Sequence, residues 1–222
     1  MFLNPDYELL VQLSLSFHYF EPVIQPPIPY IKLILRKNTN PPSQIPVRIV
    51  HYHQKWPSIA IAEMKLIHSV LSDNLLCIEH IGSTAVPGLA AKPIIDLMPI
   101  VANLEKLDQE IRELEAHGYQ IHGESGIPGR RFCTKLNVKG ERIFHVHFFD
   151  EKSDHIIRHL AFRDYLRAHT TVAKEYEQEK LRAATLQPAN SIEYNSAKSG
   201  WVKIHEQKAL QWLAARPISS FH

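Results

Sequence analysis

The most informative stretch of the sequence is residues 79–96, EHIGSTAVPGLAAKPIID, which joins two apolar runs that each predict a strand. Between those runs, Gly82 and Ser83 predict a turn. Its backbone N–H groups and hydroxyl can hold phosphate oxygens, because glycine permits a close backbone approach. Asp96 is a carboxylate in an otherwise apolar strand, and there it can present a metal ion to those phosphates.

The sequence on either side of this stretch predicts a mixed α/β domain. Apolar residues at helical spacing predict one helix over 59–71, with Pro57 in its first turn, and a second over 104–115 with Asn103 as its cap. Two of the expected strands form a hairpin through Lys139 and Gly140. The full set of expected strands is 47–52, 75–79, 93–101, 131–138 and 142–149.

The last third of the chain is predicted to be helical. The expected helices cover residues 153–168, 171–186 and 191–213. The apolar face of the third should carry Tyr194, Ala197, Trp201, Ile204, Leu210 and Leu213. The predicted fold is therefore α/β (α+β), a mixed sheet flanked by helices and followed by a C-terminal helical cap.

Composition is typical of one ordinary globular domain with an appendage. The chain has 222 residues, of which 45% are hydrophobic and 22% charged, and its formal charge is +2. That balance is too weak to indicate a nucleic-acid binder by itself. Cys77 and Cys133 lack CxxC spacing, and we find neither a membrane segment nor a signal peptide, so a cytoplasmic location is expected.

Eight of the fifteen prolines fall within the first fifty residues. Proline blocks continuous helix and central strand, so residues 1–46 are predicted to form an extended arm. The alternative is that this stretch is an artefact of start-site assignment. In either case the folded domain is expected to cover residues 47–215.

Several ordered motifs resemble the GrpB family, and together they span residues 47–213. Besides residues 79–96 they are Gly129-Arg130-Arg131-Phe132, His145-Val146-His147, the run HLAFRDYLR at 159–167, and Tyr194 with Ala197-Lys198-Ser199. The resemblance implies a fold of the nucleotidyltransferase-like superfamily, in which a Gly-Ser turn and the following acidic strand form the nucleotide and metal site. Fold alone does not imply an activity.

The strand that carries Asp96 departs from the wider nucleotidyltransferase pattern, which has two acidic residues one apart. Here the second position is Met98, whose thioether cannot serve Mg²⁺. Asp96 and Met98 should share a sheet face, because side chains alternate along a strand. Chemistry that depends on two magnesium ions is therefore not expected.

His145 and His147 are candidates to complete the metal site. They lie on one face of the expected strand 142–149, where the resemblance places a third carboxylate. With Asp96 they would form an Asp/His/His set, which suits Mn²⁺, Zn²⁺ or Fe²⁺ better than Mg²⁺. Alternatively, the two histidines are ordinary polar strand residues or direct substrate contacts.

Basic and acidic residues near these motifs supply further candidates. For nucleotide or phosphate binding they are His80, Gly82, Ser83, Lys92, Arg130, Arg131, Arg163, Tyr194 and Lys198, and for catalysis beside Asp96 they are Glu79 and Glu124. Each has a structural alternative. Arg163 can belong to a salt-bridge network that holds the cap, Tyr194 can be part of a buried helix face, and Glu124 can be a solvated loop charge.

The leading functional hypothesis is a metal-dependent enzyme that transfers a nucleotidyl group from a nucleoside triphosphate to an acceptor. Phosphoryl chemistry needs mainly positioning and charge neutralisation, which these residues can supply. Two alternatives remain: a binding module that has lost the reaction, and a metal-dependent hydrolase of a phosphorylated small molecule. The divalent ion would be Mn²⁺, Zn²⁺ or Mg²⁺.

Overall fold

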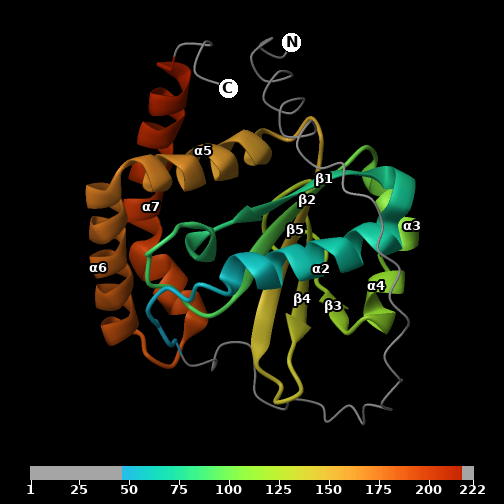
Figure 1. The fold of residues 1–222 in the computed structure, drawn as a ribbon, viewed down its shortest axis with the longest axis horizontal. Helices are drawn as coiled ribbons and strands as arrows, with labels where there is room; N and C mark the ends of the chain where they lie inside the picture. Colours follow the sequence, from blue (N-terminus) through green and yellow to red (C-terminus); the bar gives the residue numbers. More distant parts are fainter. Residues whose placement is uncertain (1–46, 217–222) are drawn as a thin grey trace.

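The computed structural model of the chain describes residues 47–216, so the arm predicted for residues 1–46 lies outside the described residues. Figure 1 shows the described part as a sheet with helices on both faces and a helical group, α5 to α7, at one side. The structure therefore confirms the predicted fold class, a mixed α/β arrangement with a C-terminal helical cap.

Five strands form one sheet in the order β1-β2-β5-β4-β3. Strands β2 and β5 run parallel, and the other neighbouring pairs are antiparallel. Parallel pairing puts Asp96 of β2 beside His145 of β5, and antiparallel pairing puts it beside Ile81 of β1. The strands are β1 (Leu75–Ile81), β2 (Ile95–Val101), β3 (Tyr119–Ile121), β4 (Arg131–Leu136) and β5 (Arg142–Asp150).

Each face of the sheet has its own apolar core, because side chains alternate between the faces of a strand. One face buries Leu97 and Phe148 under α2, α3 and α4. The other face buries Met98 and Phe149 under α5. The helices are α2 (Trp56–Leu71), α3 (Leu104–Glu110), α4 (Glu113–Ala116), α5 (Asp154–Ala168), α6 (Thr170–Leu186) and α7 (Ser191–Ala214).

The helices of the cap are held against the sheet by charged side chains as well as by apolar contacts. Arg163 of α5 donates to Glu79 of β1 at 2.6 Å, and both side chains are largely buried. Arg167 donates to the backbone carbonyl of Ala85, just after the Gly-Ser turn. Glu177 of α6 accepts from the backbone N–H of Ala90 at 2.9 Å. The cap is therefore fixed to the segment between β1 and β2.

Most expected elements are present, but three expectations were wrong. Residues 47–52 form no strand; only Val50 pairs, in a single bridge to Ala91. The helix expected over 104–115 is divided into α3 and α4. At the break the Leu114 N–H donates to the carbonyl of Ile111, three residues back instead of four, which tightens that turn. On α7, Ile204 is exposed and His205 is buried instead, since its ring stacks on Trp201 at 3.6 Å.

None of the helices in residues 47–216 has the length and apolar character needed to cross a bilayer.

The buried ion pair between Arg163 and Glu79 should contribute strongly to stability. Removing one partner of a buried pair costs about 3–5 kcal/mol, so Arg163→Met should lower the free energy of unfolding by about 3 kcal/mol. Lys106→Met, which removes a more exposed i,i+4 pair with Glu110, should cost less than about 1 kcal/mol. Urea unfolding of both variants measures this, and equal effects would contradict a structural role for Arg163.

Candidate functional site

The Gly-Ser turn packs directly against Asp96. Gly82 has φ 70° and ψ −170°, a region open to glycine almost alone. A Cβ built on Gly82 would lie 2.5 Å from Asp96 Oδ2, so no side chain fits between the turn and the carboxylate. A short 3-10 helix, Ser83–Ala85, then directs the chain away from β1. The turn and Asp96 thus form one local unit.

Asp96, His145 and His147 lie together on one face of β2 and β5. His145 Nδ1 donates to Asp96 Oδ1 at 3.0 Å, and His147 Nε2 lies 3.7 Å from the same oxygen. One ligand atom from each residue lies within 4.8 Å of the other two. The Asp96 side chain is 27% exposed, so solvent reaches the group. The structure therefore brings together the three predicted metal ligands.

Electrostatics keep this carboxylate ionised. Burial by itself would raise the pKa of Asp96, but the hydrogen bond from His145 and the nearby His147 imidazole outweigh that effect and hold the pKa well below its usual range. Burial lowers the pKa of His147 despite the nearby carboxylate. At neutral pH the site therefore contains a carboxylate and a neutral His147 imidazole.

The donor set fits a divalent ion of borderline softness, but its hydrogen bonds favour weak binding. A guanidinium only donates, so the contact of Arg130 Nη1 with His147 Nδ1 at 3.3 Å puts the imidazole proton on Nε2, where a metal would bind. His145 Nε2 is buried and has no hydrogen-bond partner among the described residues. Metal-bound imidazoles usually donate their other N–H to an acceptor. The three residues therefore fit an exchangeable ion better than a permanent one.

Lys180 contacts the Gly-Ser turn, and Lys198 lies near enough to repel both Lys180 and Lys92, so we refer to Lys92, Lys180 and Lys198 as the lysine cluster. Lys180 is 2% exposed and donates to Ser83 Oγ at 3.2 Å and to the carbonyl of Ala90. Lys92 and Lys198 lie over the ring of Tyr194, and Lys92 also donates to Ser191 Oγ. This grouping puts positive charge beside a turn that can hold phosphate.

Mutual repulsion and burial make the lysine cluster ready to accept an anion. Burial lowers the pKa of Lys180 to about 7, with Lys198 adding to the effect and Glu177 opposing it. Burial, together with Lys198, lowers the pKa of Lys92 to about 8. A bound phosphate would offset this penalty, because it favours the charged form of each lysine.

Lys180 is a site residue that the sequence analysis missed. A lysine in a helix is usually solvated, and Lys180 stands among charged residues in the sequence, with Glu177 and Glu179 close by. Its helical spacing could have revealed it, because Lys180 falls between Tyr176 and Ala183 on the buried face of α6.

Three other predicted residues are engaged in contacts within the protein. Glu79 binds Arg163, whose other donors go to Asp164 and the carbonyl of His80. His80 shares the sheet face of Leu97, opposite Asp96, and its Nε2 lies 2.9 Å from Thr84 Oγ1. Burial lowers the pKa of His80 to about 4, so it stays neutral. For Arg163 these contacts match the cap-holding alternative.

Three more predicted residues lie away from the Asp96 group or are covered. Arg131 lies on the opposite sheet face from His147 and forms a two-pronged ion pair with Asp108 of α3. Glu124 accepts from the N–H of Gly129 and closes its own loop. Tyr194 is 1% exposed, which fits the buried-face alternative and leaves no ring surface for a base.

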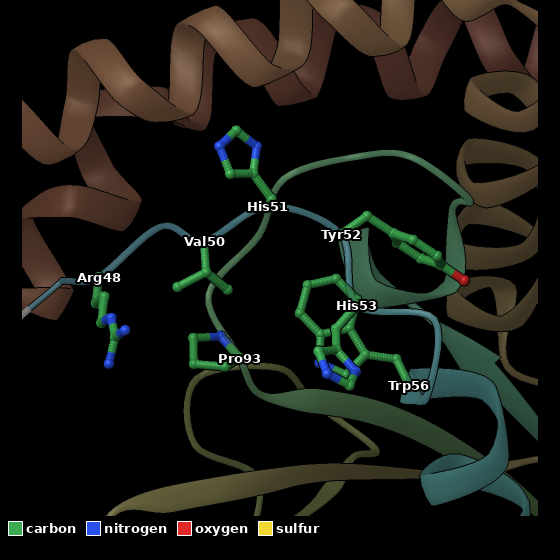
Figure 2. Close-up of a pocket in the computed structure, with 7 residues that line it drawn as sticks. All are labelled: Arg48, Val50, His51, Tyr52, His53, Trp56 and Pro93. Atoms are coloured by element: carbon green, nitrogen blue, oxygen red, sulfur yellow. The ribbon is translucent and has the colours of Figure 1, made fainter.

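A pocket of about 450 Å³ lies on another part of the surface (Figure 2). In Figure 2, Val50 and His51 run alongside the segment that carries Pro93, with Trp56 at the start of α2 below. None of the predicted site residues lines this pocket, so it is separate from the Asp96 group. Its lining residues are Arg48, Val50, His51, Tyr52, His53, Trp56 and Pro93.

Comparison with known proteins establishes the family. The sequence model described as GrpB protein matches residues 46–208. The chain belongs to the GrpB family. It is 39% identical over 170 residues to UPF0157 protein YqkA of Bacillus subtilis, a match that takes in 77% of this chain and 49% of the relative. The chain thus spans about half the length of that relative.

Solved structures agree with the family assignment. A crystal structure of conserved protein GrpB from Enterococcus faecalis matches with a TM-score of 0.71 and 38% identity, over 75% of this chain and 99% of that chain. Cid1 in complex with its short product ApU matches with a TM-score of 0.44 and 15% identity, over 62% of this chain and 43% of that chain. The second likeness is too distant to assign an activity.

The close approach of Gly82 to Asp96 should make Gly82 far less replaceable than another glycine of positive φ. Gly82→Ala brings a Cβ within 2.5 Å of Asp96 Oδ2 and should lower the free energy of unfolding by more than about 3 kcal/mol. Gly88, at φ 80°, has no atom within 4 Å of the same position, so Gly88→Ala should cost only about 1–2 kcal/mol. Similar losses in denaturant unfolding would show that the contact is unimportant.

The low pKa of Lys180 predicts a pH dependence of stability. Folding lowers the pKa from 10.5 to about 7, so between these values the unfolded chain binds the proton that the folded protein lacks. Stability should therefore rise from pH 7 to pH 9, with burial as the cause. Lys180→Met removes this contribution. Unfolding curves at both pH values measure it, and an equal pH dependence in the variant and the parent would rule it out.

Proposed function

We propose that this GrpB protein is a metal-dependent nucleotidyltransferase that holds the phosphates of a nucleoside triphosphate between the Gly-Ser turn and the lysine cluster. The observation that carries the proposal is the contact of Gly82 with Asp96. It puts phosphate-holding backbone next to a carboxylate that two imidazoles flank. Few other arrangements would require glycine at that position.

Each part of the site has a distinct role in this proposal. Ser83 and the backbone of the turn hold phosphate oxygens, and Lys180, already hydrogen-bonded to Ser83, neutralises their charge. Asp96, His145 and His147 would hold a divalent ion, which supplies charge neutralisation on the phosphates when it is bound. Asp96, His145 and His147 would hold the ion weakly by themselves, so metal binding should be stronger in the presence of nucleotide than in its absence.

The reaction itself needs little covalent participation by the protein. An acceptor oxygen forms a bond to the α-phosphorus as the bond between that phosphorus and pyrophosphate breaks, and pyrophosphate and the proton of the acceptor are released. Glu79 and Glu124, predicted as catalytic, are engaged by Arg163 and by Gly129. In this proposal the protein therefore acts through positioning and charge rather than through either of these bases.

A second candidate function is supported by Met98. It is fully buried on the Asp96 face, where the wider superfamily pattern has a second carboxylate. A thioether gives no ligand for a second hard cation, which suits a module that binds nucleotide without turnover. The two candidates differ in whether bound nucleotide is consumed, so pyrophosphate release distinguishes them.

A matrix of thermal shifts tests the proposed site. Each common nucleoside triphosphate is combined with Mg²⁺, Mn²⁺ or Zn²⁺, and a ligand at about 100 times its dissociation constant should add about 2.7 kcal/mol of stability. We expect a small shift with metal alone, a larger one with metal and nucleotide together, and loss of the larger shift in Asp96→Ala and Lys180→Met.

Asp108→Ala is the matched control for removing a carboxylate. Asp108 pairs with Arg131 on the opposite face, so this variant should keep the nucleotide shift of the parent. If no combination at millimolar concentration shifts the parent, or if Asp96→Ala responds as fully as Asp108→Ala does, the proposed site is wrong.

A further inference from the structure

A second group of basic side chains lies beyond His147, and we refer to Arg130, Arg158, His155 and His159 as the arginine cluster. Arg130 Nη1 contacts His147 Nδ1, and Arg158 Nη2 donates to His155 Nδ1 at 3.3 Å and to His159 Nε2 at 3.1 Å. The rings of His147 and His159 lie 6.0 Å apart. The arginine cluster thus joins the loop before β4 to the start of α5.

Arg130 is the unusual member, because it is a buried charge without a counter-ion. It is 8% exposed, its nitrogens reach only the carbonyls of Glu124 and Ser125 and the ring of His147, and its guanidinium lies over the ring of Phe132 at 4.9 Å. No carboxylate among residues 47–216 forms an ion pair with it. Buried charges are normally paired, since an uncompensated one costs several kcal/mol. This arrangement indicates that an anion is missing from the neighbourhood of Arg130.

The neighbours of Arg130 reinforce this conclusion. Arg158 repels it, while Glu206 already binds Arg158. His155 and His159 accept from Arg158 on one nitrogen, so each carries its proton on the other. The arginine cluster therefore offers mostly hydrogen-bond donors and positive charge, which is the chemistry that recognises a compact oxyanion such as phosphate.

The two basic clusters lie at opposite ends of the Asp96 group. Lys92 precedes β2, whose Ile95 pairs with Phe144, whereas Arg130 precedes β4, whose Arg131 pairs with Phe148. Four residues of extended strand correspond to roughly 13 Å. A triphosphate chain held by the lysine cluster is too short to cover that distance, which leaves the arginine cluster to another anionic group.

We infer that the arginine cluster binds an anionic group of the acceptor, and that the acceptor is a small molecule carrying a phosphate or another compact oxyanion. That the bound molecule is the acceptor rests on the proposed function, but the anion site itself does not. Arg130 would bind the oxyanion directly, and Arg158 would hold His155 and His159 with their N–H donors available. The nucleophilic oxygen of the acceptor would then lie towards Asp96.

Calorimetric titration at constant ionic strength tests the anion site. Inorganic phosphate is the probe, and acetate is the comparison ligand that shows whether a carboxylate binds as well. Arg130→Gln should weaken phosphate binding by roughly tenfold or more, because it removes charge-assisted hydrogen bonds. Lys106→Met, which removes a lysine of α3 that belongs to neither cluster, should leave this binding unchanged, whereas Lys180→Met should at most remove a separate phosphate held at the lysine cluster. Competition by acetate at similar concentrations would identify a general oxyanion site, whereas binding of phosphate alone would identify a phosphate site.

Two outcomes would overturn the inference. In one, Arg130→Gln binds phosphate as tightly as the parent does; in the other, phosphate binding is lost only in Lys180→Met. If the near-ultraviolet circular dichroism of Arg130→Gln shows that the variant does not fold, Arg130→Met takes its place, because it also removes the charge and an unchanged phosphate affinity there has the same meaning. Nucleotide shifts are measured on the same variants. Failure of the parent to bind any nucleotide would refute the proposed function while leaving the phosphate result valid.

Discussion

The contact between the backbone of Gly82 and the carboxylate of Asp96 is the constraint on which the site depends. It exists because β2 is shared: antiparallel pairing brings the end of β1 to Asp96, and parallel pairing brings His145 to its other side. A partly buried carboxylate at the junction of three strands needs hydrogen-bond donors, and His145 donates to it while His147 lies 3.7 Å away. The sheet topology thereby fixes the acidic centre before any ligand binds.

The positively charged side chains near Asp96 form two separate groups. The cap contributes Lys180 and Lys198 on one side, while Arg130 and Arg158 lie on the other. Buried and mutually repelling cations make a folded protein less stable unless an anion joins them. The arrangement is easiest to understand as one adapted to bound anionic ligands, whose binding offsets a repulsion that the fold maintains without them.

Sequence periodicity was sufficient to predict β1, β2, β4 and β5, the cap helices and the meeting of Asp96 with the histidines, because alternation and motif spacing are local properties; the three-residue β3 is too short to show such a pattern. It failed where long-range contacts decide. Lys180 is buried only because α6 packs on the Gly-Ser turn, and Arg131 turns to Asp108 because it falls on the α3 face. Residues 47–52 have strand composition, but the bridge that they form, from Val50 to Ala91, lies outside the sheet.

His147 lies between Asp96 and the arginine cluster, and as a neutral imidazole it has one ring lone pair to offer to either side. A neutral imidazole that accepts from Arg130 at Nδ1 carries its proton at Nε2, so it cannot at the same time bind a metal through Nε2. Metal binding there requires the proton to be at Nδ1, where it would face the guanidinium as a second donor. Arg130 must therefore turn away before His147 becomes a ligand, and an oxyanion beside Arg130 gives that guanidinium an alternative acceptor. Occupation of the arginine cluster and metal binding at Asp96 should consequently favour one another.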